Sequence, residues 1–198
     1  MSGRYLIAID VGIKNLGFCV FDFCTGKIVY WDCVNLIPNG KYIPSNNVDY
    51  VRSFVQKYEH YFDSAHKILV ERQIRCNMRI VEAVLQTMYY NVCIVVSARS
   101  VKMHYDLSTK NYRQNKQKAV LWASEFVKQN PNALEAEPIN NWSSYKKQDD
   151  LADALLLVMY YLDTYSNQLQ GKYVIVEGGL LLQCTCGRTQ NASFLFRY

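Results

Sequence analysis

Four carboxylates occupy positions where an acid is costly unless it has a partner. Asp10 and Glu71 each follow a short apolar run, and Asp150 and Asp153 are three residues apart in a segment of helical period. That spacing places two side chains on one helical face. A buried acid needs a cation, a metal or hydrogen-bond donors. If the four converge, their hard oxygens suit Mg²⁺ or Mn²⁺, and two such ions can support phosphodiester hydrolysis.

Other residues that could do chemistry have simpler interpretations. The pair Asp149-Asp150 stands where a helix begins, and a helix N-terminus favours negative charge without any function. The histidines have no metal or triad spacing, and we interpret them as surface or packing residues: His60, His66 and His104. Cys184 and Cys186 lack a second pair or a nearby histidine, so we interpret them as free thiols. The carboxylates therefore remain the strongest candidates.

Short apolar runs between turn residues predict the strands. The expected strands are Tyr5–Ile9, Leu16–Asp22, Lys27–Val34, Lys67–Val70 and Val92–Val96. The first three are joined by short glycine turns, which predicts an antiparallel meander. The last is nearly all apolar, so we expect it to be central and buried.

Helical spacing predicts the remaining elements. The expected helices are Val48–Phe62, Met78–Tyr90, Asn115–Gln129 and Gln148–Tyr165. A meander followed by alternating strands and helices predicts an α/β protein with a mixed five-stranded sheet and helices on both faces. We expect one domain over residues 1–165 and an extension of uncertain structure over 166–198, in which 173–176 and 179–183 could be short strands.

The composition restricts the compartment and the partners of the protein only weakly. The chain has 198 residues, a net charge of +5 and seven cysteines, most of them in apolar runs. This predicts buried free thiols in a reducing compartment. The longest apolar run falls far short of a membrane span, so we expect a soluble intracellular protein with no membrane partner. The mild basic charge permits a polyanionic partner without requiring one.

Three segments carry a family resemblance. They read I-D-V-G-I-K-N-L-G over residues 9–17, V-E-R-Q over 70–73 with Arg75 beyond, and K-K-Q-D-D-L-A-D-A over 146–154. In this order they resemble the first, second and last motifs of the Holliday junction resolvases of the RuvC and mitochondrial type, and most of all those of poxviruses. The resemblance covers about residues 4–163 and implies a ribonuclease H-like fold.

The resemblance implies a site and a reaction. It implies that the metal ligands, and catalytic residues, are Asp10, Glu71, Asp150 and Asp153, with Asp149 an ambiguous neighbour of Asp150. It places a catalytic lysine near the scissile phosphate, for which Lys102, expected in a loop, fits best and Lys110 is the alternative. It further implies a homodimer, two Mg²⁺ ions that Mn²⁺ can replace, no small-molecule cofactor, and paired nicks in four-way DNA junctions with 5′ phosphates. The setting it implies is the infected host cytoplasm, where viral genome concatemers are resolved.

Basic and polar residues near these motifs fit a DNA partner, because lysine and arginine hold the phosphodiester backbone with little sequence preference. The candidates are Lys14, Asn15, Arg72, Arg75, Arg79, Lys110, Arg113, Lys116, Lys118, Lys146 and Lys147. A solvated helix face explains Lys116 and Lys118 equally well. Tyr112 could contact an unpaired base.

Three other functions remain open at this point. One is a nuclease of the same fold that acts on RNA–DNA hybrids. Another is an ATP-binding protein of the actin and sugar-kinase type, whose first phosphate motif also reads D-x-G after a strand. That class needs two lobes and a second such motif, for which the chain has little room. The third is a junction-binding module without catalysis.

Overall fold

The computed structural model describes residues 3–37, 40–135, 142, 144–169, 174–176 and 179–181. Its strands are β1 Tyr5–Asp10, β2 Leu16–Asp22, β3 Lys27–Val34, β4 Ala65–Glu71, β5 Cys93–Val96, β6 Val174–Val176 and β7 Gly179–Leu181. Its α-helices are α1 Asn47–Lys57, α2 Glu59–Phe62, α3 Cys76–Met88, α4 Ala98–His104, α5 Tyr112–Gln129 and α6 Gln148–Leu169. Short 3₁₀ turns lie at Pro44–Asn46 and Pro131–Ala133.

The five-stranded sheet has the order β3-β2-β1-β4-β5. Strands β1, β2 and β3 pair antiparallel, whereas β4 pairs parallel with both β1 and β5. The β2–β3 turn uses Gly26 at φ 68°, a left-handed conformation that glycine adopts without a Cβ penalty. The predicted meander and mixed sheet are therefore confirmed.

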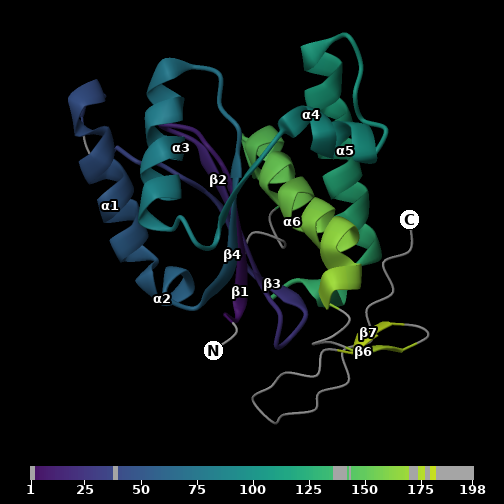
Figure 1. Cartoon of the computed structure of the whole chain (residues 1–198). Coiled ribbons are helices and arrows are strands. Elements are labelled where there is room, and N and C mark those ends of the chain that lie inside the picture. Colours follow the sequence, from purple (N-terminus) through teal and green to yellow (C-terminus); the bar gives the residue numbers. More distant parts are fainter. Residues whose placement is uncertain are drawn as a thin grey trace.

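Helices cover both faces of this sheet, as Figure 1 shows, with α1 and α3 on one side and α5 and α6 on the other. The alternation of β1 explains this arrangement. Leu6 and Ala8 belong to the core beneath α5 and α6, whereas Ile7 and Ile9 belong to the core beneath α1 and α3. Successive strand residues point to opposite faces, so a fully apolar strand needs cover on both.

Helix α6 lies unusually close to the sheet. A Cβ atom on Gly17 would come 2.2 Å from the Asp150 carbonyl oxygen, so only glycine fits beneath the first turn of α6. Trp31 in β3 adds an anchor, because its indole Nε1 donates to the Leu151 carbonyl at 2.9 Å. Gly17 is also the register partner of Asp10. This packing therefore brings the acidic start of α6 to the end of β1.

Strand β5 differs from the expectation of a central, buried strand. It is an edge strand, and three of its four residues are only half-buried. Its apolar character has another cause: Cys93 packs into one core and Ile94 into the other. Helices on both faces demand apolar residues whether or not a strand has two neighbours in the sheet.

The largest differences between the predicted and observed helices are three. The segment expected as one helix over 48–62 breaks at Tyr58 into α1 and α2. Residues 98–104 form α4, although a loop was expected around Lys102. Helix α5 begins at Tyr112, three residues before the predicted start, because the Asn111 side chain accepts hydrogen bonds from the backbone amides of Arg113 and Gln114 and so caps the first turn.

The C-terminal segment contains one of the expected features. β6 and β7 pair antiparallel, close to the two short strands that the sequence allows. Helix α6 runs to Leu169, and the division into residues 1–165 and 166–198 stays a prediction. Cys184 and Cys186 lie outside the described residues. Within the described part of the chain, no helix has the length and apolar character needed to cross a bilayer.

The cysteines are less buried than expected. Among the residues that the structure describes, Cys19 is buried, Cys24, Cys33 and Cys93 are half-buried, and Cys76 is exposed, all as free thiols. Cys76 begins α3, outside both cores, which explains its exposure.

Candidate metal and nucleic-acid site

Three acids converge at one end of the sheet. Asp10 ends β1, Glu71 ends β4 and Asp153 lies in the second turn of α6. Each offers a carboxylate oxygen, and these three oxygens all lie within 4.8 Å of one another. Because β1 and β4 are parallel neighbours, their carboxyl ends meet at the same edge. The close approach of α6 to Gly17 brings the third acid.

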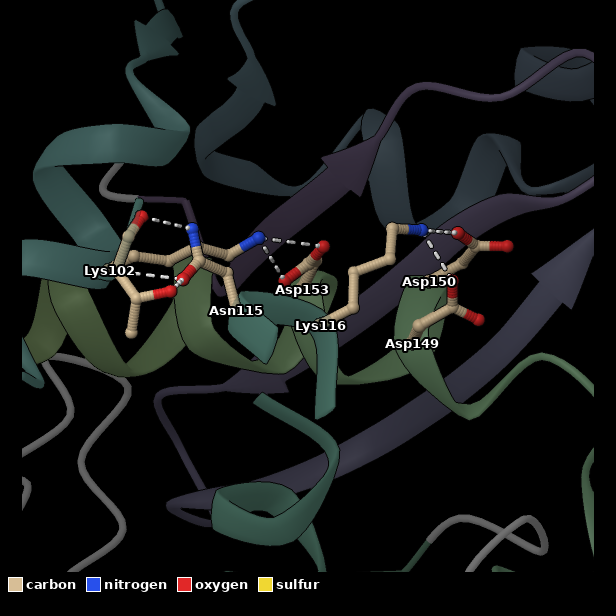
Figure 2. Close-up of polar contacts among 7 residues, drawn as sticks. Lys102, Asn115, Lys116, Asp149, Asp150 and Asp153 are labelled. Carbon is tan, nitrogen blue, oxygen red and sulfur yellow. Dashed lines mark hydrogen bonds and ion pairs between the residues drawn. The ribbon is translucent and has the colours of Figure 1, made fainter. Parts of the chain in front are cut away.

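The remaining predicted acid, Asp150, is not part of this cluster of three. Its Oδ1 lies 3.5 Å from Lys116 Nζ, and Lys116 also forms an ion pair with Asp149. Figure 2 shows Lys116 reaching from α5 to both aspartates at the start of α6. Asp150 still influences the cluster, because its charge contributes to raising the pKa of Asp10.

Lys102 supplies the cation nearest the cluster. Its Nζ lies 3.1 Å from Asp153 Oδ1 and donates to Oδ2 at 3.3 Å. Both side chains are nearly buried, at 12% and 8% exposure. Figure 2 shows this contact beside the one that Lys116 makes. The structure thus brings Lys102 to the acidic cluster, whereas Lys110, the alternative, is exposed in the loop before α5.

Burial and mutual repulsion favour protonation of the clustered acids. Burial, and then the negative charges of Glu71 and Asp153, raise the pKa of Asp10 well above its usual range. Burial and the charge of Asp153 raise the pKa of Glu71 to about 7, although Lys102 opposes this. Burial also raises the pKa of Asp153, against the effect of Lys102. A divalent cation would relieve this repulsion and hold all three ionised.

The two aspartates at the start of α6 differ in their electrostatics. Burial, and then the charge of Asp149, raise the pKa of Asp150. For Asp149, burial acts in the same direction, but the hydrogen bond and charge of Lys116 outweigh it and lower the pKa. Asp149 therefore has a cation of its own, and Asp150 is the aspartate in greater need of one.

The donors fit a hard divalent cation. Carboxylate oxygens are the ligands that Mg²⁺ and Mn²⁺ prefer. Asp153 Oδ1 is buried and, within the described residues, accepts no hydrogen bond, despite the nearby Lys102. A buried acceptor of this kind is costly unless something binds it. Asp10, Glu71 and Asp153 could together hold one ion.

The predicted DNA-binding residues differ in their positions relative to the clustered acids and in their exposure. Lys14 and Asn15 lie in the β1–β2 turn, directly after Asp10. Arg72 follows Glu71, and Arg75 and Arg79 lie at the start of α3. These three arginines, like Lys14, Lys110, Arg113, Lys118, Lys146 and Lys147, are exposed. Lys116 differs: it is half-buried and bound to acids, so it is not the solvated lysine that its spacing equally allowed.

Other residues shape the site without having been predicted. The amide of Gln73 donates to Glu82 Oε2 at 2.6 Å, and its side chain donates to the Glu71 carbonyl at 3.2 Å, which fixes the loop after β4. The histidines are surface or packing residues, as expected: His60 and His66 contact aromatic rings, and the exposed His104 lies 3.4 Å from Asp163. In the sequence, Gln73 stood only as the last residue of the V-E-R-Q motif, which gave it no role of its own.

Without a cation, we expect the protein to lose stability as the pH rises from about 4.5 to about 7. The pKa of Glu71 moves from 4.5 to about 7 on folding, so the folded state holds a proton that the unfolded state has released. The stabilisation is complete below the lower value and is lost as the pH passes the higher one. The measurement is the melting temperature in EDTA across this range, with Mg²⁺ removing the loss.

The Glu71→Gln variant isolates this effect from the titration of other acids. The difference in melting temperature between the variant and the unmodified protein should grow in favour of the variant as the pH rises. A constant difference would show that Glu71 is ionised in the folded protein throughout the range.

The fold is similar to that of several solved structures. The Holliday junction resolvase of fowlpox virus is 18% identical, with a TM-score of 0.58, over 81% of this chain and 98% of that one. The fowlpox virus resolvase in complex with substrate Holliday junction DNA is 16% identical, with a TM-score of 0.58, over 81% and 97%. RuvC of Thermus thermophilus is 13% identical, with a TM-score of 0.50, over 81% and 96%. The predicted ribonuclease H-like fold is therefore confirmed.

Sequence comparison identifies a family. No curated protein matches the chain by sequence. The family model described as the poxvirus A22 protein matches residues 4–164, which include all four predicted acids and Lys102. The match spans the five-stranded sheet and the acidic cluster, and the chain therefore belongs to the poxvirus A22 protein family.

Proposed function

We propose that this protein is a metal-dependent endonuclease that resolves four-way DNA junctions. The observation that carries the proposal is the convergence of Asp10, Glu71 and Asp153 within 4.8 Å on this fold. The fowlpox virus resolvase of the same fold was solved with its substrate, Holliday junction DNA. Membership of a poxvirus family supports a role in the host cytoplasm, on branched viral DNA such as genome concatemers.

Asp10, Glu71 and Asp153 would hold one divalent cation, and Asp150 would help Asp10 to hold a second. The cations, Mg²⁺ or Mn²⁺, would activate water and stabilise the leaving 3′ oxygen of the phosphodiester, which leaves a 5′ phosphate. The protein itself supplies the negative charges that would bind the cations, and its fold fixes the positions of these carboxylates. Gly17 lets α6 approach closely enough for Asp150 and Asp153 to reach the end of β1.

Lys102 favours the ionised form of Asp153 and holds the side chain in place before substrate arrives, because its Nζ contacts both carboxylate oxygens. When a cation neutralises Asp153, the ammonium group becomes available to a phosphate oxygen. The exposed Lys14, Arg72 and Arg75 follow the ends of β1 and β4 within four residues in the chain. They would hold the DNA backbone with little sequence preference.

A homodimer would explain paired cleavage. A four-way junction has approximate two-fold symmetry, and a two-fold dimer presents two sites of matching polarity. We propose that each protomer nicks one strand and that the nicks are ligatable. The catalytic unit of this proposal is residues 1–165.

The test is cleavage of end-labelled four-way junctions, linear duplex and RNA–DNA hybrid, with Mg²⁺ or EDTA. The proposal expects symmetric nicks in the junction alone, dependent on the metal and closed by DNA ligase. Cleavage of the hybrid instead would identify a ribonuclease. Tight junction binding without turnover in any metal would identify a binding module, and either result would overturn the proposal.

A pair of variants distinguishes the two adjacent aspartates. We expect Asp150→Asn to reduce cleavage by at least ~10²-fold, because it removes a proposed metal ligand, and Asp149→Asn to reduce it by less than ~10-fold. Asp149 already has Lys116 as its partner, and its pKa is lowered rather than raised. The measurement is single-turnover cleavage at saturating Mg²⁺. The reverse order of effects would make Asp149 the ligand.

A further inference from the structure

A groove lies between the first half of α5 and the start of α6, next to the acidic cluster. Its volume is about 670 Å³, and its lining includes Tyr112, Arg113, Lys116, Leu121, Lys146 and Asp149. Lys116 and Asp149 belong to both the groove and the site, because their ion pair forms the boundary between them. A DNA strand that passed over the acidic cluster and continued along α6 would enter this groove.

The charge of the groove favours an anion. Lys116 and Asp149 neutralise each other. Arg113 and Lys146 are exposed and form no ion pair with any residue that the structure describes. Two uncompensated cations, Arg113 in α5 and Lys146 in the turn before α6, are complementary to a phosphodiester backbone.

The apolar part of the groove favours a planar base. The Tyr112 side chain is 70% exposed and Leu121 is 69% exposed, although both are large apolar groups. The Lys116 ammonium lies 5.6 Å from the Tyr112 ring centroid. The Asn111 cap fixes the first turn of α5 and with it the position of Tyr112. Exposed aromatic rings in basic grooves are stacking platforms for unpaired bases of any identity.

We propose that this groove binds one unpaired nucleotide of the DNA strand that passes through the acidic site. Its base would lie against Tyr112, in the first turn of α5, and its phosphate between Arg113 and Lys146. The volume suits a ligand of this size. This proposal rests on the proposed function, and it supplies a means of telling a branch point from a continuous duplex, in which every base is stacked and paired.

The test uses 2-aminopurine, whose fluorescence falls when it stacks. The probes are a four-way junction with the analogue at the branch point, the same junction with it within an arm, and the single strand alone. Full-length protein carrying Asp10→Asn binds without turnover. We expect quenching at the branch point and in the single strand, and none within the arm.

Substitutions then assign the quenching to the groove. Tyr112→Leu should remove the quenching and weaken binding roughly tenfold, whereas Tyr112→Phe should keep both. Tyr90, in the turn after α3, is the matched control because it is 75% exposed and outside the groove, so Tyr90→Leu should change neither. Leucine is a good helix former, so the Tyr112 variant should keep the fold.

The outcomes separate this proposal from the proposed function. If the protein cuts junctions but Tyr112→Leu gives the same quenching and binding as the unmodified protein with every probe, the groove proposal fails and the proposed function stands. If quenching depends on Tyr112 but junctions are never cut, the groove stands and the function fails. A concentration-dependent dimer that Leu121→Ser disrupts, without quenching, would make the groove a protein interface and overturn the proposal.

Discussion

Replacing Asp10 with asparagine is expected to stop junction cleavage and to stabilise the protein in the absence of metal. Asn keeps the shape of the side chain but cannot hold a cation as a carboxylate does. We expect a loss of at least ~10²- to 10³-fold in single-turnover rate at saturating Mg²⁺, with junction binding retained. Binding survives because the exposed basic residues that would hold the DNA backbone are unchanged.

The stability effect follows from the position of Asp10. Burial and the charges of Glu71 and Asp153 raise its pKa, so at neutral pH folding must either bury a repelled charge or take up a proton. Both cost free energy, and Asn avoids both. The melting temperature in EDTA should therefore rise by a few degrees, while the stabilisation by Mg²⁺ should shrink.

Asp49 provides a matched control for this substitution. It is exposed in the first turn of α1, far along the chain from the acidic cluster. Asp49→Asn should leave cleavage and metal binding unchanged and should not raise the melting temperature, since Asp49 stands at a helix N-terminus that favours its charge. If Asp10→Asn cuts junctions at the normal rate, the assignment of the metal site is wrong.

Replacing Lys102 with methionine is expected to have the largest effect on the stability of the metal-free protein. The substitution leaves Asp153 buried beside Asp10 and Glu71 without its nearest cation. Breaking a buried ion pair in this way costs about 3–5 kcal/mol, which for a chain of this size lowers the melting temperature by roughly 6–20 °C. The loss should grow with pH, since protonation of the acids relieves it.

Added Mg²⁺ should recover most of that stability, because a divalent cation supplies the missing charge. Cleavage at saturating Mg²⁺ should nevertheless stay at least ~10²-fold below normal if the ammonium group contacts the scissile phosphate. The two measurements separate the role of Lys102 toward Asp153 from its role toward substrate. Full recovery of cleavage with Mg²⁺ would show that Lys102 only positions Asp153 and does not act on the substrate.

Lys128 provides the matched control for this substitution. Its Nζ lies 4.0 Å from Glu125 on the surface of α5, and both side chains are more than half exposed. Solvent-exposed pairs of this kind contribute about 1 kcal/mol or less. Lys128→Met should therefore lower the melting temperature in EDTA only slightly. A similar decrease for both variants would show that the Lys102 contact has no special strength.

The amino-acid sequence determined the strands and the two acids at their ends. β2 and β3 have the predicted bounds, and Asp10 and Glu71 end β1 and β4 as expected. These features depend on alternation, glycine turns and the cost of placing an acid after an apolar run, all of which act within a few residues. The resemblance of three short motifs then indicated the fold and the family, which the structure and the family model confirm.

Features that depend on how distant segments pack could not be predicted in the same way. Edge strands and central strands are equally apolar when helices cover both faces of the sheet. The prediction therefore placed β5 at the centre of the sheet, although it lies at the edge. The seven-residue α4 is too short for its period to be recognised, although it presents Lys102 to Asp153.

The tertiary structure alone decided which acids meet. Asp150 and Asp153 share a helix, yet only Asp153 joins Asp10 and Glu71, while Asp150 lies beside Lys116. Which aspartate joins the cluster depends on how closely α6 approaches Gly17 and on the position of α5 beside α6. Both arise from contacts between segments that are far apart in the chain, whose energies no local pattern of residues contains.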